Sequence, residues 1–176
     1  MNSLLNPLAK TSISVPQAIV WSGIVVGVLD ALDGVVAFGL LGMNPMQVLQ
    51  YIASGALGPS AFQGGWATAG LGVLLHFFIA FVVAAIYVLA SRFAHALRLQ
   101  PVAWGLLYGA LVYLVMTYGV LPLSAVGKSA FSPGLFLNGI IGHALFVGLP
   151  IALYARRATN AGHMPASPLP RQGGRI

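Results

Sequence analysis

Long apolar stretches alternate with short polar segments along this chain. Four of these stretches, residues 17–41, 67–90, 102–121 and 135–154, contain almost no charged side chains. A helix of about 20 apolar residues crosses the hydrocarbon core of a bilayer, which is about 30 Å thick. The pattern therefore predicts an all-α integral membrane protein whose four transmembrane helices pack as a bundle.

Composition supports a membrane location. Of the 176 residues, 59% are hydrophobic and 6% are charged, whereas soluble domains carry roughly 25% charged residues. The net charge of +6 does not indicate nucleic-acid binding, because the basic residues are scattered instead of gathered in a patch that could follow phosphates. The absence of cysteine excludes disulfides and thiolate metal sites. We expect residues 1–155 to form one domain, with the lipid bilayer as its main partner.

The polar segments predict two further features. Between the first two spans, Asn44 can cap a helix that has Pro45 in its first turn and ends at Gly55. We expect this short helix to lie on the outer surface of the membrane. Residues 156–176 are polar and rich in proline and glycine, which predicts a disordered cytoplasmic tail.

Basic residues predict the orientation of the chain. With four spans, both termini and the loop between the second and third spans share one side of the membrane. That side carries Lys10, Arg92, Arg98, Arg156, Arg157, Arg171 and Arg175, while Lys128 lies on the other. Loops rich in Lys and Arg remain in the cytoplasm. We therefore expect both termini to be cytoplasmic.

The spans show signs of an internal repeat. "GVLLHFFIAFVVAAIY" begins at Gly72 and "GIIGHALFVGLPIALY" begins at Gly139; in both, His follows Gly by four positions and Tyr follows His by eleven. The first and third spans share the pattern Gly-x-x-x-Gly, at Gly23, Gly27, Gly105 and Gly109. Two helix hairpins of the same orientation, related by a pseudo-twofold axis, would give this pattern. Coincidence among glycine-rich spans is the alternative.

The only two acidic residues, Asp30 and Asp33, lie within the first span. They are three positions apart, so they share one helix face, together with Gly23, Gly27 and Gly34. Small residues at this spacing let transmembrane helices approach closely. We therefore expect the acids to point into the bundle, as intramembrane ionisable groups usually do.

Other polar residues fall at a similar depth. His76 and His143 lie about 13 and 12 Å from the outer ends of their spans. The predicted intramembrane polar cluster consists of Asp30, Asp33, His76, His143, Thr117 and Asn138. The glycines expected at helix contacts are Gly23, Gly27, Gly34, Gly72, Gly105, Gly109, Gly139 and Gly142.

Three interpretations of the cluster remain open. It can pin the bundle by hydrogen bonds, in a structural or partner-binding membrane protein. It can move protons or small solutes, which requires a homo-oligomer because four spans are too few to enclose a pathway. It can also bind a divalent metal, or a haem held by His76 and His143. No metal-binding signature is present, so no cofactor is expected, and no catalytic residue is assigned; we do not expect an enzyme.

Two stretches resemble known proteins. "ASGALGPSAFQGGWATAGLGVLLHFFIAFVVAAIYVLASR" and "WGLLYGALVYLVMTYGVLPLSA" resemble a widespread set of small, uncharacterised bacterial inner-membrane proteins, and are distantly similar to the YagU-type membrane proteins. The resemblance covers most of residues 20–155. It implies four spans in a bacterial inner (plasma) membrane, and it transfers no functional residue.

Overall fold

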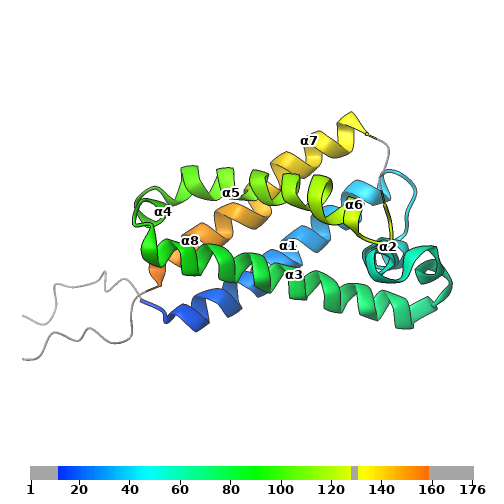
Figure 1. The fold of residues 1–176 in the computed structure, drawn as a ribbon, viewed down its shortest axis with the longest axis horizontal. Helices are drawn as coiled ribbons and strands as arrows, with labels where there is room; N and C mark the ends of the chain where they lie inside the picture. The colour runs from blue at the N-terminus through cyan, green and yellow to red at the C-terminus, as the bar shows by residue number, and fades with distance from the viewer. Residues whose placement is uncertain (1–11, 128–130, 159–176) are drawn as a thin grey trace, which may run out of the picture.

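A computed structural model describes residues 12–127 and 131–158, which are almost entirely helical (Figure 1). In chain order the elements are α1 (Val15–Gly39), α2 (Pro45–Leu57), η1 (Gly58–Gln63), α3 (Gly65–Phe93), α4 (Ala96–Leu99), α5 (Pro101–Val115), η2 (Met116–Val120), α6 (Leu121–Leu123), α7 (Pro133–Gly142), η3 (His143–Gly148) and α8 (Leu149–Arg157). The η1 segment is a 3₁₀-helix, and η2 and η3 are π-helices. The predicted all-α class is confirmed.

Four helices are long and apolar enough to cross a membrane. They are α1, α3, the continuous helix Pro101–Leu123 and the continuous helix Pro133–Arg157, with mean hydropathies between 1.8 and 2.7. The four predicted spans are therefore confirmed, and the observed helices differ from them by a few residues at their ends. The second and fourth helices run on through Arg92 and Arg157 because long basic side chains can reach the membrane surface from a helix end.

Both ends of the described chain meet at one end of the bundle. The Ile13 N–H donates a hydrogen bond to the Arg157 carbonyl, with 3.1 Å between N and O. The short α4 lies at this same end, which we call the terminal end, whereas α2, η1 and α6 lie at the opposite end, which we call the α2 end (Figure 1). The predicted tail beyond Ala158 lies outside the described residues.

The predicted surface helix is present as α2. Asn44 and Gln47 form a reciprocal capping box around Pro45. The helix continues past Gly55, where the sequence suggested an end, and stops before Gly58. Gly58 has φ of +66°, a conformation that glycine adopts without the steric cost paid by other residues, so it terminates the helix there.

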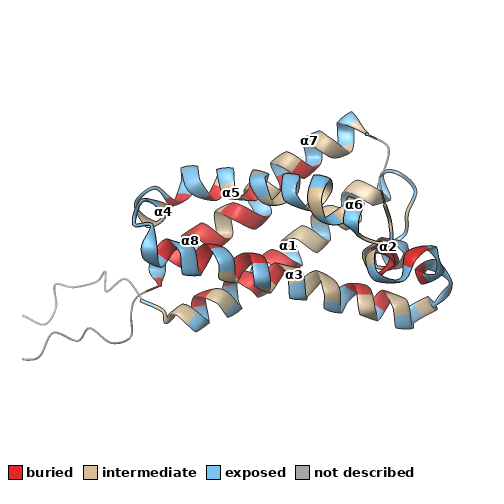
Figure 2. Cartoon of the chain, in the orientation of Figure 1, coloured by how far each residue is buried: buried red, intermediate tan, exposed pale blue. Residues whose placement is uncertain are grey.

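The apolar core is concentrated in the terminal half of the bundle. Figure 2 shows buried residues gathered on α3, α8 and the start of α1, whereas the spans towards the α2 end are mostly half-buried or exposed. The core residues are Ala18, Val26, Ala80, Val83, Ala84, Tyr87, Val88, Val147, Ile151, Ala152, Ala155 and Ala158. One half of the bundle is thus tightly packed and mostly apolar, with Ser22 and Ser91 as buried polar residues, and the other half is more open.

Glycines set the contact between the first two spans. A Cβ added at Gly27 would fall on the ring of Phe77, and one added at Gly23 would fall on the ring of Phe81. These phenylalanines lie one and five positions after His76. The Gly-x-x-x-Gly pattern of α1 is therefore filled by two aromatic rings from α3.

The second hairpin packs in the same register. A Cβ added at Gly109 would fall on the backbone of His143 and Ala144, and one added at Gly105 would lie 3.0 Å from the Gly148 carbonyl oxygen. Ala144 and Gly148 again lie one and five positions after a histidine. This similar register agrees with two related hairpins. In the second hairpin, however, backbone atoms and the Ala152 side chain lie where the first hairpin has aromatic rings.

Each π-helix precedes a proline. The η2 and η3 segments end two residues before Pro122 and Pro150. Proline has no N–H, and its ring clashes with the carbonyl four residues earlier. The preceding turn widens, which is a common form of π-bulge and one often found at functional sites. In the fourth span this widened turn is η3, which begins at His143 and ends before Pro150.

Candidate functional site

Asp33 contacts the fourth span through an amide and a glycine. The Asn138 side-chain amide donates a hydrogen bond to Asp33 Oδ2, with 3.1 Å between Nδ2 and Oδ2. A Cβ added at Gly142 would lie 2.5 Å from the same carboxylate oxygen. The Asp33 carboxylate can therefore approach α7 because position 142 lacks a side chain.

Asp30 faces His143 at the start of the π-helix. His143 Nδ1 lies 3.7 Å from Asp30 Oδ1, and both side chains are 22% exposed. This ring nitrogen is itself buried and has no hydrogen-bond partner among the described residues. The Tyr113 ring packs edge-on against the imidazole, with 5.3 Å between centroids, and it lies where a side chain at Gly139 would be. The two side chains therefore approach closely without forming a hydrogen bond to each other.

His76 contacts the backbone of α1. Its Nε2 lies 2.8 Å from the Gly27 carbonyl oxygen. A carbonyl oxygen only accepts hydrogen bonds, so Nε2 carries a proton and donates it to this contact. The Phe77 ring lies edge-on to the imidazole, with 5.7 Å between centroids. His76 thus binds α1 one turn from Asp30, without contacting either acid directly.

These contacts form a series along α1. We call the three pairs Asn138–Asp33, His143–Asp30 and His76–Gly27 the α1 ladder. At 1.5 Å rise per residue, its α1 positions lie about 9, 13 and 18 Å from the end of α1 at Gly39. The ladder begins in the more open half of the bundle and stops at Val26, where the apolar core begins.

The structure brings four of the six predicted cluster residues into direct pairs, and His76 lies on the next turn. Thr117 lies in η2, and its side chain makes no hydrogen bond within the described part of the chain. Among the predicted packing glycines, Gly72 contacts the Leu49 carbonyl of α2 instead of another span. Gly34 has nothing within 4 Å of the place where a Cβ would lie. At Gly34, therefore, this face of α1 is not packed against another described helix.

Tyr113 is a site residue that the sequence did not single out. Besides contacting His143, its hydroxyl donates to the Leu135 carbonyl, with 3.4 Å between the oxygens, and so ties α5 to α7. The available signal was its position four residues after Gly109, which places both on one face of α5. The sequence alone could not show that His143 lies opposite this face of α5, because that depends on how the helices are arranged.

The arrangement offers little for a metal or a haem. Within residues 12–127 and 131–158, no group of three or more His, Cys, Asp or Glu side chains could hold a metal ion. Axial ligation of haem by two histidines needs one nitrogen of each ring directed at the same iron. His76 Nε2 and His143 Nδ1 instead face two different positions of α1. Metal or haem binding stays a prediction without geometric support.

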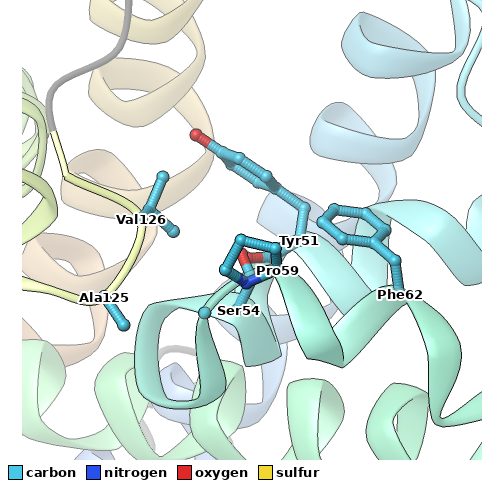
Figure 3. Close-up of a pocket in the computed structure, with 7 residues that line it drawn as sticks. Tyr51, Ser54, Pro59, Phe62, Ala125 and Val126 are labelled. Atoms are coloured by element: carbon cyan, nitrogen blue, oxygen red, sulfur yellow. The ribbon is translucent and has the colours of Figure 1, made fainter.

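A separate cavity of about 140 Å³ lies at the α2 end. Figure 3 shows that Ala125 and Val126 face it from one side and that Tyr51, Ser54, Pro59 and Phe62 of α2 and η1 face it from the other. The Ser54 hydroxyl already donates to the Tyr51 carbonyl. The lining is mostly apolar and has no charged side chain and no histidine.

Comparisons add no relative. The chain matches no family model, no curated protein and no solved structure. The resemblance to YagU-type membrane proteins therefore rests on the sequence stretches alone and stays a prediction.

Proposed function

We propose that this membrane protein moves protons, as an oligomer, and that the α1 ladder is its proton-binding part. The observation that carries the proposal is the Asp30–His143 pair, with 3.7 Å between Oδ1 and Nδ1 inside a membrane span. A carboxylate and an imidazole both exchange protons in water near neutral pH or below. Ionisable side chains within membrane spans are rare and mark proton and ion pathways.

The packing of the bundle supports a path that enters from one side. The ladder lies in the open half, whereas the terminal half is filled by apolar side chains such as Val26, Val83 and Ile151. A proton that enters at the α2 end therefore reaches His143 and Asp30 but finds no titratable group between them and the terminal end on α1. A single copy supplies half a path, and neighbouring copies or a conformational change must supply the rest.

The direction of entry follows from charge. Arg92, Arg98, Arg156 and Arg157 all belong to the terminal end, and such basic ends face the cytoplasm. On this basis the ladder opens to the outer side of the membrane, and the resemblance places the protein in a bacterial inner membrane. Protons are a better cargo than larger solutes because the ladder offers ionisable groups, among them the Asp30–His143 pair.

A structural role is the second candidate, and two hydrogen bonds between helices favour it. His76 binds a backbone carbonyl of α1, and Asn138 binds Asp33, so both contacts tie α1 to a neighbouring span. Hydrogen bonds between transmembrane helices stabilise bundles by about 0.6–2 kcal/mol each. In this case the acids hold the fold together and carry no proton.

Proton flux into liposomes separates the two candidates. The purified protein is reconstituted, a membrane potential is imposed, and acidification is followed with an enclosed pH-sensitive dye. We expect Asp30→Asn to abolish flux while its thermal unfolding temperature stays within a few degrees of the wild type. Thr117→Val is the matched control, because Thr117 lies in a span but outside the ladder. Equal flux in wild type, Asp30→Asn and empty liposomes would refute the transport proposal.

A further inference from the structure

The geometry points to a second copy of this chain as the partner that covers Asn138 and Asp33. Two copies pack side by side through α7, and Asn138 of each binds Asp33 of the partner subunit. The inference rests on the proposed function, which requires an oligomer, and it names the surface through which the copies meet.

Asn138 contacts Asp33 of α1 and lies at the edge of a face of α7 that is otherwise exposed. Asn138 is exposed, and Leu137 and Ile141, which lie on the same side of the helix, are 59% and 49% exposed. We call Gly134, Leu137, Asn138 and Ile141 the α7 face. A Cβ added at Gly134 would meet nothing within 4 Å, so this face has room for another helix. The Asn138 amide is unusual because it lies in an otherwise apolar, exposed surface.

The amide lies within the membrane and not beyond it. Asn138 is five residues into a 25-residue span, or about 8 Å from its end. A helix of that length is about 37 Å long, and the hydrocarbon core is about 30 Å thick. Asn138 therefore lies inside the hydrocarbon region, where lipid tails cannot form hydrogen bonds.

The hydrogen-bonding capacity of the pair is only partly used. An asparagine side chain has two donors and one acceptor oxygen. Among the described residues, Asn138 donates one hydrogen bond, to Asp33 Oδ2. The second N–H, the amide oxygen and Asp33 Oδ1 have no partner in this part of the chain. Unpaired polar groups in hydrocarbon cost several kcal/mol each, so a partner with matching groups is strongly favoured.

A second copy has matching groups. In a twofold interface, the contact of one residue with another occurs twice, once in each direction. The free N–H of Asn138 can then bind Asp33 of the partner subunit, and the reciprocal bond forms at the same depth. Both copies must have the same orientation in the membrane for these depths to match, which agrees with the one-sided distribution of arginine.

Cysteine cross-linking tests the interface, because the chain contains no cysteine. Leu137→Cys and Ile141→Cys are made singly and treated in native membranes with a short bismaleimide. Leu74→Cys is the matched control, since Leu74 is 70% exposed at a similar depth on α3. We expect dimers from the two α7 variants and none above background from the control. Equal yields from α3 and α7, or cross-links only to other proteins, would overturn the inference.

Two further variants test the role of the polar pair. In the Ile141→Cys background, Asn138→Leu removes both reciprocal bonds, and we expect association to weaken about tenfold. Asp33→Asn keeps hydrogen-bonding groups but cannot ionise, so its cross-linking should remain near that of the Ile141→Cys parent. Unchanged cross-linking in Asn138→Leu would show that the amide does not pair the copies and would overturn this part of the inference.

The cross-linking and flux results are independent. Dimers through α7 without proton flux would reject the proposed function and leave the interface standing. Flux without dimers through α7 would reject the interface and leave the proton-moving function standing.

Discussion

At the scale of single residues, glycines determine where polar side chains can lie in this membrane protein. Gly142 makes room for the Asp33 carboxylate, and Gly139 makes room for the Tyr113 ring that packs on His143. Gly27 contributes its carbonyl to His76 and accepts the Phe77 ring where a side chain would be. The positions of these polar side chains therefore depend on glycines, which have no side-chain functional group of their own.

This dependence predicts opposite behaviour for two glycines. In Gly142→Ala, the new methyl group displaces the Asp33 carboxylate and breaks its hydrogen bond to Asn138. In Gly34→Ala, the methyl group meets open space, and alanine in place of a helical glycine stabilises by about 0.5–1 kcal/mol. We expect Gly142→Ala to be less stable than Gly34→Ala by about 1–2 kcal/mol, since an interhelical hydrogen bond is also lost.

Thermal unfolding in one detergent measures the difference between these two variants. Because both replace glycine by alanine within a membrane span, detergent and helix propensity affect them alike. Equal unfolding temperatures would mean that Asp33 has room to move and that position 142 does not hold it against Asn138.

At the scale of elements, the π-helices are the feature that aims His143. The η3 segment begins at His143 and ends two residues before Pro150. A π-helix holds one extra residue in a turn, so the side chains before it are rotated about the helix axis relative to those after it. We therefore expect Pro150, two turns away, to influence the direction of His143 relative to α8.

Replacing Pro150 should therefore move His143. In Pro150→Ala the N–H returns, the turn can close as an α-helix, and we expect the imidazole to rotate away from Asp30. The measurement is the rate of disulfide formation in Asp30→Cys/His143→Cys, with and without Pro150→Ala. We expect a marked slowing with Pro150→Ala, and little change with Pro122→Ala, whose π-helix lies in another span. Equal rates in all three backgrounds would contradict a role for η3 in aiming the ring.

At the scale of the whole molecule, the bundle has an open half with the ladder and a closed half with the core (Figure 2). This division predicts one-sided access. A cysteine in place of Gly34, beside the ladder, should react with a membrane-impermeant maleimide added outside intact cells. The same reagent should fail to label it from the cytoplasmic side of inverted vesicles. A cysteine in place of Ala84, which is fully buried, serves as the unreactive control. Labelling of position 34 from the cytoplasmic side would contradict the proposed orientation.

Much of this organisation could be predicted from sequence, because it follows from one-dimensional patterns. The four spans follow from apolar length, and the face shared by acids and glycines predicts acids that point into the bundle, but only the fold shows that Asp33 meets Asn138 of the fourth span. The His76 contact could not be foreseen, because every residue has a carbonyl and only the fold determines which carbonyl lies opposite the ring. Gly34 lacks the predicted neighbour because α3 packs on α2 near that end, through Gly72 and Leu49.

The central claim, that the ladder carries protons, can be tested on the acids directly. The chain has only two acidic side chains, so infrared difference spectra of the lipid-reconstituted protein contain few carboxyl bands. Spectra are recorded between pH 4 and 8 for the wild type, Asp30→Asn and Asp33→Asn. We expect a protonated-carboxyl band that appears reversibly on acidification and is missing in Asp30→Asn. A band that is insensitive to pH, or one that is unchanged in both variants, would show that the acids do not exchange protons and that their role is structural.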